Sequence, residues 1–131
     1  MTFNFERDPE SGIILVGIFL DGRCRLKVVV DTGASNTTLD SSALYIANYD
    51  LQDALGLVEI ETANGVVQTE IFEIQELTAL GITRRNFPVQ VFDFLSHGVL
   101  SDYQGLLGMD FFEGTKFCID TVNSQISVET P

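Results

Sequence analysis

Apolar and polar residues near the start of the chain follow the pattern of a β-hairpin. Residues 13–20 and 23–30 are rich in β-branched and aliphatic side chains, and Asp21 and Gly22 stand between them. β-Branched residues favour extended backbone, and an Asp-Gly pair accepts the positive φ angles of a tight turn. The pattern therefore predicts two antiparallel strands, the second of which ends in a run of three valines.

Further apolar segments predict more strands and little helix. The expected strands are 58–61, 66–71, 72–77, 87–94, 116–120 and 125–128. The polar segments expected to be loops are 48–53, 84–86 and 96–104. A short helix is expected through Ala43, Leu44 and Ile46, with Asp40 or Ser41 as its cap. The fold is therefore predicted to be mainly β, with one or two short helices.

The length of the chain predicts a single domain over residues 1–131. This length is enough to bury one core, and no internal repeat or linker interrupts the pattern. Hydrophobic residues make up 45% of the composition, which excludes a disordered chain.

Charge and hydropathy exclude two classes of partner. The chain carries seven Lys and Arg against 19 Asp and Glu, which gives a formal net charge of −12 at pH 7. Such a chain is poorly suited to nucleic acid, which needs a basic surface for its phosphates. The longest apolar stretch, 13–20, is too short to span a bilayer, and no cationic segment precedes it as in an export signal. We expect a cytoplasmic protein that binds neither nucleic acid nor membrane.

The cysteines and the histidine give no sign of a metal site or a cofactor. Cys24 and Cys118 lack the spacing of a metal-binding pair, and His97 is the only histidine. The two cysteines could form one disulfide, but the missing export signal favours reduced thiols in the core. We expect neither a metal nor a cofactor.

The strongest chemical feature is the acid that follows the valine strand. Residues 31–35 read Asp-Thr-Gly-Ala-Ser, so a buried strand leads into a carboxylate, two hydroxyl groups and a glycine. An acid at the end of an apolar strand needs hydrogen-bond donors, and Gly33 lets a substrate approach the backbone closely. The alternative is a polar turn that merely ends a strand, because these residue types are common in turns.

Two motifs resemble those of the aspartic proteases. Residues 31–34 resemble the catalytic turn, and Leu106, Leu107 and Gly108 resemble the two apolar residues and glycine that pack beneath it. The order of hairpin, catalytic turn, helix, second hairpin and last hairpin over residues 13–128 is similar to one lobe of such an enzyme. The resemblance implies a closed or partly open β-barrel of the acid-protease type, as in the single-lobe, retroviral-type enzymes called retropepsins.

The chain holds only one motif of this kind. No second Asp is followed by Thr or Ser and then Gly, whereas aspartic-protease chemistry needs two carboxylates that share a proton. Retropepsins meet this need as homodimers. The resemblance therefore implies that Asp31 from each of two subunits forms a dyad that activates water to hydrolyse a peptide bond. The implied partners are a second copy and a peptide or protein substrate.

The resemblance also assigns roles to residues around this dyad. Thr32 would bond across the two-fold axis, and Gly33 would accept a hydrogen bond from the substrate backbone. Ala34 and Ser35 would line the substrate, with Ser35 orienting the carboxylate. The second hairpin resembles the flap that covers a bound peptide, although such a tip is also typical of an ordinary β-turn. The residues of its tip are Thr62, Ala63, Asn64 and Gly65.

Two positions depart from the retroviral pattern. Ser35 and Met109 stand where retroviral enzymes usually carry an acid and an arginine that form a dimer-stabilising ion pair. Assembly must therefore rest on other contacts, such as terminal strands or apolar loops. The residues at 110–112 are closer to the bacterial and pepsin-like form of this element.

Three functions follow from these observations. The favoured one is a homodimeric aspartic endopeptidase. The second is a catalytically idle module of the same fold that binds or scaffolds a protein, because a fold does not guarantee activity. The third is an acidic, β-rich interaction domain in which Asp31 only ends a strand.

Overall fold

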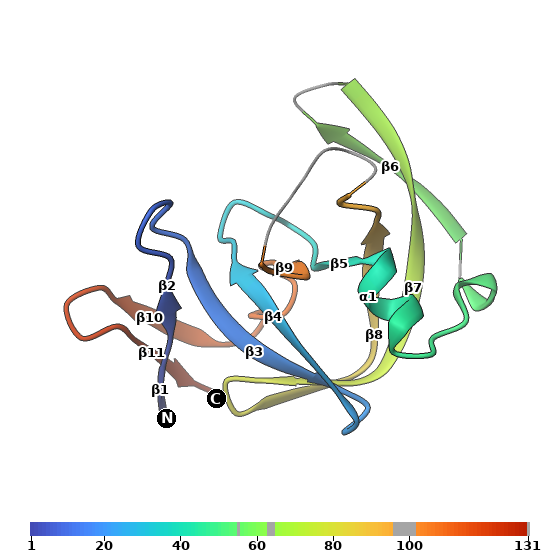
Figure 1. Ribbon diagram of the computed structural model, residues 1–131. Helices are drawn as coiled ribbons and strands as arrows, with labels where there is room; N and C mark the ends of the chain where they lie inside the picture. Colours follow the sequence, from blue (N-terminus) through green and yellow to red (C-terminus); the bar gives the residue numbers. More distant parts are fainter. Residues whose placement is uncertain (55, 63–64, 96–101, 131) are drawn as a thin grey trace.

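The computed structural model describes residues 1–54, 56–62, 65–95 and 102–130, and in these residues β-structure dominates (Figure 1). A small terminal sheet has the strand order β1 (Thr2–Asn4), β11 (Gln125–Glu129) and β10 (Lys116–Asp120). The main sheet has the order β2 (Glu6–Arg7), β3 (Ile14–Leu20), β4 (Cys24–Val30), β9 (Gly105–Leu107), β5 (Thr38–Asp40), β8 (Ile82–Phe92), β7 (Gly65–Ala79) and β6 (Gly56–Thr62). The helices are α1 (Ser41–Ile46) and the single 3-10 turn η1 (Leu51–Asp53).

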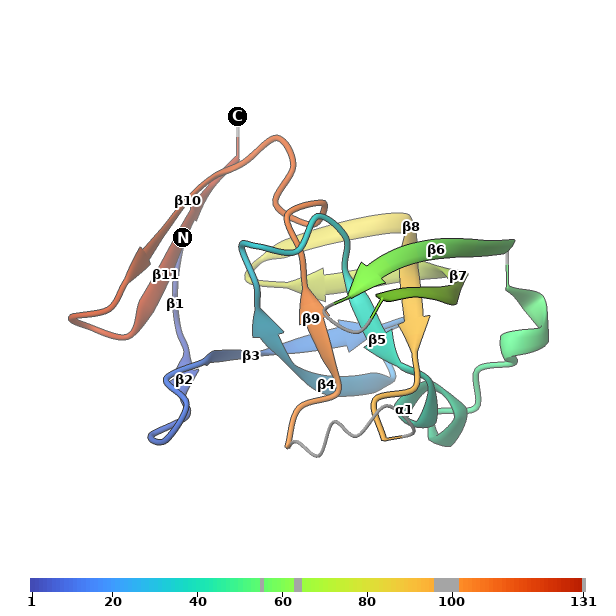
Figure 2. The ribbon, with the colours of Figure 1, turned by 90° about the horizontal axis from the view of Figure 1, so that it is seen from above.

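The main sheet closes on itself. β3 pairs with β7 through Phe19 with Thr78 and Leu20 with Leu77. As a result, β3, β4, β9, β5, β8 and β7 form a closed barrel. Figure 2 shows the terminal sheet to one side of this barrel, with both chain ends at that sheet. The expectation of a mainly β barrel with few helices is confirmed.

The first hairpin forms as its sequence predicts. Asp21 and Gly22 adopt φ angles of 53° and 65° in the turn between β3 and β4. The Asp21 carboxylate also accepts hydrogen bonds from the Tyr49 hydroxyl at 2.6 Å and from the Glu76 backbone N–H at 2.9 Å. Burial raises the pKa of the Tyr49 phenol, and the hydrogen bond from its hydroxyl to Asp21 raises this pKa further. The turn therefore ties the hairpin to β7 and to the segment after α1.

In the centre of the chain, the turn between two long strands lies at a different position from the one expected. The strands expected at 66–71 and 72–77 are a single strand, β7, and residues 84–86 lie inside β8 rather than in a loop. Leu80 and Gly81 make the turn between these strands, with φ angles of 51° and 73°. An apolar residue seldom adopts a positive φ, so Leu80 gives no turn signal in the sequence.

The short helix is present with Asp40 at its N-cap position, but the Asp40 side chain makes no capping hydrogen bond. Asp40 precedes α1 and makes no side-chain hydrogen bond to it, and Ser41 is already its first residue. The Asp40 Oδ1 atom instead accepts a hydrogen bond from the Phe94 backbone N–H at 3.3 Å. The parallel pairing of β5 with β8 brings these two residues together. Further along, the loop expected at 48–53 contains η1, and most of the loop expected at 96–104 lies outside the described residues.

The short strands β1 and β2 lie outside every predicted segment. β1 contains three residues and pairs with the distant β11, and β2 contains two residues and pairs with the neighbouring β3. Too few residues alternate in either strand to give a periodic signal.

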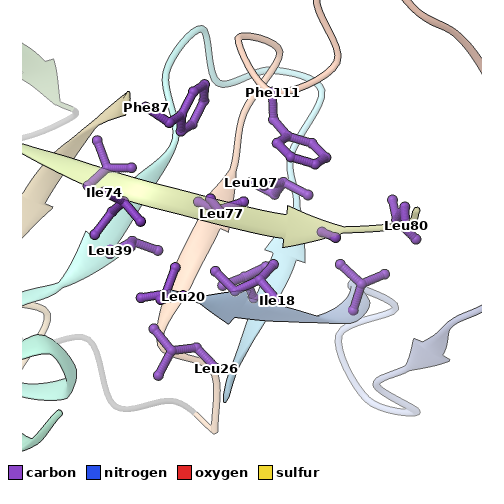
Figure 3. Packing of buried hydrophobic residues seen from close by; sticks show 14 of the residues in the cluster. Ile18, Leu20, Leu26, Leu39, Ile74, Leu77, Leu80, Phe87, Leu107 and Phe111 are labelled. Carbon is purple, nitrogen blue, oxygen red and sulfur yellow. The ribbon is translucent and has the colours of Figure 1, made fainter. Parts of the chain in front are cut away.

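Buried apolar side chains from almost every barrel strand fill the interior (Figure 3). Ile18 and Leu20 come from β3, Ile74 and Leu77 from β7, and Leu107 from β9, and all five are fully buried. Residues far apart in sequence therefore meet in one core. Leu107 belongs to this core, and its strand β9 pairs with the end of β4 and lies directly beside it.

The two cysteines are free, and only one of them has a half-buried side chain. Cys24 is half-buried on β4, whereas Cys118 on β10 is exposed, so the expectation of core thiols is wrong for Cys118. Among the described residues, no helix has the length and hydropathy needed to cross a membrane.

Candidate active site

Asp31 lies at the end of two neighbouring parallel strands. Val29 pairs with Leu106 and Val30 with Leu107, so β4 and β9 run side by side in the barrel wall. The Asp31 backbone N–H donates a hydrogen bond to the Leu107 carbonyl at 3.0 Å, which extends this pairing by one residue. The strand that the valines dictate therefore delivers a half-buried acid to a fixed point at the barrel end.

The backbone turn after Asp31 binds one oxygen of its carboxylate. The Gly33 N–H donates to Asp31 Oδ1 at 2.9 Å, and the Ala34 N–H donates to the Asp31 carbonyl at 3.2 Å. A Cβ atom at Gly33 would lie only 3.3 Å from Oδ1, so a larger residue would crowd the carboxylate. Among the described residues, Oδ2 has no hydrogen-bond donor. One carboxylate oxygen is thus held, and the other is available to a proton, water or substrate.

Gly108 lets the segment after β9 pass directly beneath the Asp31 loop. A Cβ atom there would lie 2.6 Å from the Asn36 carbonyl carbon and 2.9 Å from the Ala34 oxygen, distances that real side chains do not reach. Two backbone bonds follow, from the Met109 N–H to the Ala34 oxygen at 2.8 Å and from the Asp110 N–H to the Ser35 oxygen at 3.2 Å. Residues 108–110 are therefore held directly against the Asp31 loop.

Buried Thr37 and half-buried Asp110 join the two segments through hydrogen bonds. Thr37 is fully buried, and its Oγ1 donates to Asp110 Oδ1 at 2.8 Å, while its backbone N–H lies 3.0 Å from both Asp110 carboxylate oxygens. The Thr37 Oγ1 also accepts from the Gly108 N–H at 3.1 Å, and Asp110 Oδ1 accepts from the Phe111 N–H at 2.8 Å. Both ends of the Asp31 loop are therefore fixed.

Sequence reasoning missed this pair. Asp110 stood out only for its similarity to a bacterial form of the motif, and Thr37 did not stand out at all. Thr37 stands in a short polar run before Leu39, six positions after Asp31, and such a run gives little sign of burial. A hydroxyl at such a position needs a partner once it is buried.

Arg84 on β8 binds the turn that follows Gly108 through hydrogen bonds to backbone carbonyls. Its guanidinium donates to the Phe111 carbonyl at 2.9 Å and 2.7 Å and to the Glu113 carbonyl at 2.5 Å. The same guanidinium lies 5.7 Å from the centre of the Phe111 ring. Its neighbour Arg85 instead forms an exposed ion pair with Glu76. The two arginines, which the sequence suggested were a solvated loop, thus have different surroundings.

The remaining predicted site residues lie on two separate elements. Thr32 and Ser35 are exposed and Ala34 is half-buried, all on the Asp31 loop. Thr62 pairs with Gly65 at the end of the β6–β7 hairpin, where Gly65 has a φ of 113°. Ala63 and Asn64 lie outside the described residues. In Figure 1, β6 and the start of β7 lie above the loop that follows β4.

The described residues contain no group of His, Cys, Asp and Glu side chains that could hold a metal ion. Around Asp31 the structure places one carboxylate with an available oxygen, an adjacent glycine backbone and exposed hydroxyl groups.

Comparisons with known proteins agree with this geometry. The family model described as aspartyl protease matches residues 16–111. No curated protein sequence matches the chain. The structure is similar to that of a retropepsin-like aspartic protease from Rickettsia conorii, with 23% sequence identity, a TM-score of 0.73 and coverage of 99% of this chain and 91% of that chain.

These matches test the expectations that the two motifs raised. The structural likeness shows the fold, so the acid-protease barrel implied by the motifs is confirmed. The family match includes both the Asp31 loop and the segment that contains Gly108. Because it also covers well over half of the chain, this protein belongs to the aspartyl protease family.

Proposed function

We propose that the chain is an aspartic endopeptidase that works as a homodimer, with Asp31 of each subunit in one shared site. The observation that carries the proposal is the Asp31 carboxylate, which binds the Gly33 N–H through one oxygen and leaves the other available. The loop around it is fixed by the close approach of Gly108 and by the hydrogen bonds between Thr37 and Asp110. A rigid loop with one available oxygen suits a catalytic acid better than a turn that only ends a strand.

The need for a second subunit follows from the chemistry. Two carboxylates in contact share one proton, because two full negative charges at short distance repel each other strongly. The ionised Asp31 takes a proton from a water molecule, and the oxygen of that water attacks the scissile carbonyl carbon. The protonated Asp31 gives its proton to the carbonyl oxygen. Collapse of this intermediate breaks the C–N bond as a proton passes to the amine.

The neighbouring residues take supporting roles in this proposal. Thr32 of each subunit bonds across the two-fold axis, and Gly33 accepts a hydrogen bond from the substrate backbone. Ala34 and Ser35 line the bound peptide. The β6–β7 hairpin, with its tip at residues 62–65, closes over the substrate as a flap and excludes bulk water. Exposed backbone groups at such a tip suit an extended peptide.

The test of the function is Asp31→Asn, which keeps the shape of the side chain but cannot share a proton. Cleavage of a complex peptide mixture, read from new peptide ends by mass spectrometry, should fall at least about 100-fold, since acid–base groups contribute on that scale. Asp102→Asn is the matched control, because Asp102 is an exposed acid away from the Asp31 loop. That variant should cleave at the normal rate.

A pepstatin-type inhibitor separates the alternatives. It should bind the wild-type protein and suppress cleavage if the proposal is right. Inhibitor binding without any cleavage would instead support the idle module of the same fold. A protein that neither binds the inhibitor nor loses activity in Asp31→Asn is no aspartic protease.

A further inference from the structure

The start of β4 gathers positive charge in an otherwise acidic chain. Arg23 directly precedes β4, and Arg25 and Lys27 follow at every second position within it. All three are exposed, and they are three of only seven Lys and Arg in the chain. Neither β3 nor β4 contains an acidic residue, although the chain has 19 Asp and Glu. This part of the surface therefore differs in charge from the molecule as a whole, whose net charge is −12.

The three cations differ in the partners that they already have. Arg23 Nη1 donates a hydrogen bond to the Ala47 carbonyl at 2.6 Å, just after α1. Lys27 Nζ lies 2.9 Å from Glu6 Oε2 in an exposed ion pair. Among the described residues, the Arg25 side chain makes no ion pair and no hydrogen bond. The guanidinium of Arg25 is therefore the one whose N–H donors are available to an anion.

The Arg25 guanidinium is held against β3 by two neighbours. Its central carbon lies 5.6 Å from the centre of the Phe19 ring, and Phe19 stands opposite Arg25 in the pairing of the two strands. A Cβ atom at Gly17 would lie only 3.2 Å from Arg25 Nε and 3.3 Å from Nη2, so the glycine leaves the space that the guanidinium occupies. Arg25 is thus positioned before any ligand arrives, which reduces the entropy cost of binding.

Two hollows meet at Arg25. One lies between β4 and residues 4–6 and has a volume of about 500 Å³. The other lies between β4 and the end of α1 and has a volume of about 450 Å³. Arg25, Leu26 and Gln104 line both hollows, so together they form a groove across β4. We call it the β4 groove, and each half is large enough for a side chain of a bound peptide.

The half of the β4 groove beside α1 has an apolar wall. Tyr45 and Ile46, the last two residues of α1, are 76% and 79% exposed. Ile46 lines this half of the groove together with Ala43 and Leu26. Adjacent large apolar side chains that face solvent beside a hollow are typical of a contact surface. The β4 groove therefore combines an available guanidinium with an apolar wall.

An acidic peptide in extended conformation suits these two features. A carboxylate accepts two parallel N–H bonds from a guanidinium, and residues two positions apart in a strand share a face. An acid and an aliphatic residue at that spacing would therefore reach Arg25 and Ile46 together. A polynucleotide is disfavoured by the net charge of −12. An anionic membrane attracts several uncompensated cations, whereas Lys27 is already paired with Glu6.

We propose that the β4 groove docks an acidic, extended segment of a partner protein, with a carboxylate on Arg25 and an aliphatic side chain against Ile46. Arg25 stands six residues before Asp31, about 20 Å away along an extended strand. The docking site is therefore separate from the proposed catalytic carboxylate. Because docking needs neither proteolysis nor a second copy of the chain, it goes beyond the proposed function and does not depend on it.

Peptide binding tests the β4 groove directly. The probe is the fluorescein-labelled peptide Ser-Glu-Glu-Leu-Leu-Glu-Glu-Ser, followed by fluorescence anisotropy. Arg25→Ala should raise the dissociation constant at least about tenfold, since hydrogen bonds between charged groups contribute on that scale. Arg85→Ala, which removes an equal charge from the exposed pair with Glu76, is the matched control and should stay within about twofold. Equal effects of the two variants, or no binding to the wild-type protein, would overturn the proposal.

Two further variants distinguish a built site from a general attraction of charge. Arg25→Lys keeps the charge but not the planar fork, so it should restore only a small part of the affinity. Full recovery would mean that charge alone attracts the peptide and would overturn the proposal. Ile46→Ser should weaken binding of the leucine peptide but not of a version with serine in place of leucine. Equal weakening of both peptides would rule out the apolar contact.

Asp31→Asn separates this site from the proposed function. That variant should lose proteolysis and still bind the peptide with wild-type affinity. Peptide binding without proteolysis in the wild-type protein would leave the docking site standing and remove only the enzyme, whereas proteolysis without peptide binding would remove only the docking site. Phosphatidylserine vesicles or a single-stranded oligonucleotide that bind through Arg25 when the peptide does not would also overturn the assignment to a protein partner.

Discussion

At the scale of single residues, buried polar groups rather than apolar ones fix the geometry around Asp31. Thr37 bonds to two residues, Asp110 and Gly108, through one hydroxyl and one backbone N–H, and Asp110 accepts bonds from Thr37 and Phe111. A buried group that loses its partner costs more than the bond itself contributes, because no water replaces it. Thr37 is therefore expected to affect both stability and activity, although it does not touch the substrate.

Thr37→Val keeps the shape of the side chain and removes this hydroxyl. It should lower the free energy of unfolding by about 1–3 kcal/mol, since Gly108 and Asp110 each lose a buried partner. It should also slow cleavage as the Asp31 loop loosens. Thr38→Val is the matched control, because among the described residues that hydroxyl makes one long hydrogen bond, 3.4 Å to Gln90. Urea unfolding and cleavage rates of both variants decide the matter, and equal losses would contradict a special role for Thr37.

At the scale of elements, β8 stabilises the turn at residues 111–113, next to the site, through one of two adjacent arginines. Arg84 donates to the carbonyls of the turn at 111–113, whereas Arg85 pairs with Glu76 in solvent. Hydrogen bonds from a charged donor contribute about 1.5–3 kcal/mol, and exposed ion pairs typically contribute under about 1 kcal/mol. Two adjacent arginines are therefore expected to contribute unequally to the free energy of unfolding.

Replacement of each arginine by alanine tests this difference. Arg84→Ala should lower the unfolding free energy by about 2 kcal/mol and reduce the cleavage rate, because the turn that holds Asp110 is released. Arg85→Ala should stay within about 0.5 kcal/mol of the wild-type value. Arg84→Lys, which keeps the charge but not the planar fork, should recover only part of the loss. Indistinguishable melting curves for the two alanine variants would refute the assignment.

The β6–β7 hairpin allows a second test at this scale. Gly65 has a φ of 113°, and among the described residues, its chain neighbours apart, no atom lies within 4 Å of the position where a Cβ would stand. Gly65→Val therefore strains the backbone without a clash, because a β-branched residue resists positive φ. If the hairpin is a flap, cleavage should fall more than the melting temperature suggests. A large loss of melting temperature with normal turnover per folded molecule would mean an ordinary hairpin.

At the scale of the whole molecule, the proposed site exists only when two strongly acidic chains meet. Each copy has a formal net charge of −12, so association works against long-range repulsion. The two Asp31 carboxylates add a local repulsion, which disappears when they share one proton. Assembly should therefore respond to concentration, pH and salt together.

We expect specific activity to fall on dilution and to rise from neutral to mildly acidic pH. Acid favours the shared proton and reduces the net charge, and added salt at neutral pH should partly reproduce the second effect. Sedimentation and peptide cleavage on one dilution series at two pH values would measure both. Full activity in a monomeric sample would exclude a shared site.

The first hairpin shows what the sequence predicts well. Asp21 and Gly22 carry a local signal, and their φ angles of 53° and 65° agree with it. Leu80 shows the opposite case, since its positive φ is imposed by the pairing of β7 with β8 and not by its own preference. The sequence also pointed to Asp31 and Gly108 through short motifs, but it gave no reason to connect Thr37 with a residue 73 positions away.

The sequence by itself determined the mainly β content, the strand that ends at Asp31 and the glycine beneath it, because turn preferences and apolar alternation act over a few neighbouring residues. Only the tertiary structure decided that β3 closes on β7, that Asp110 and Arg84 hold the loop, and that β10 is the last described strand of the terminal sheet. These features depend on pairings between distant segments. Packing and buried hydrogen bonds select such pairings, and no local pattern records them.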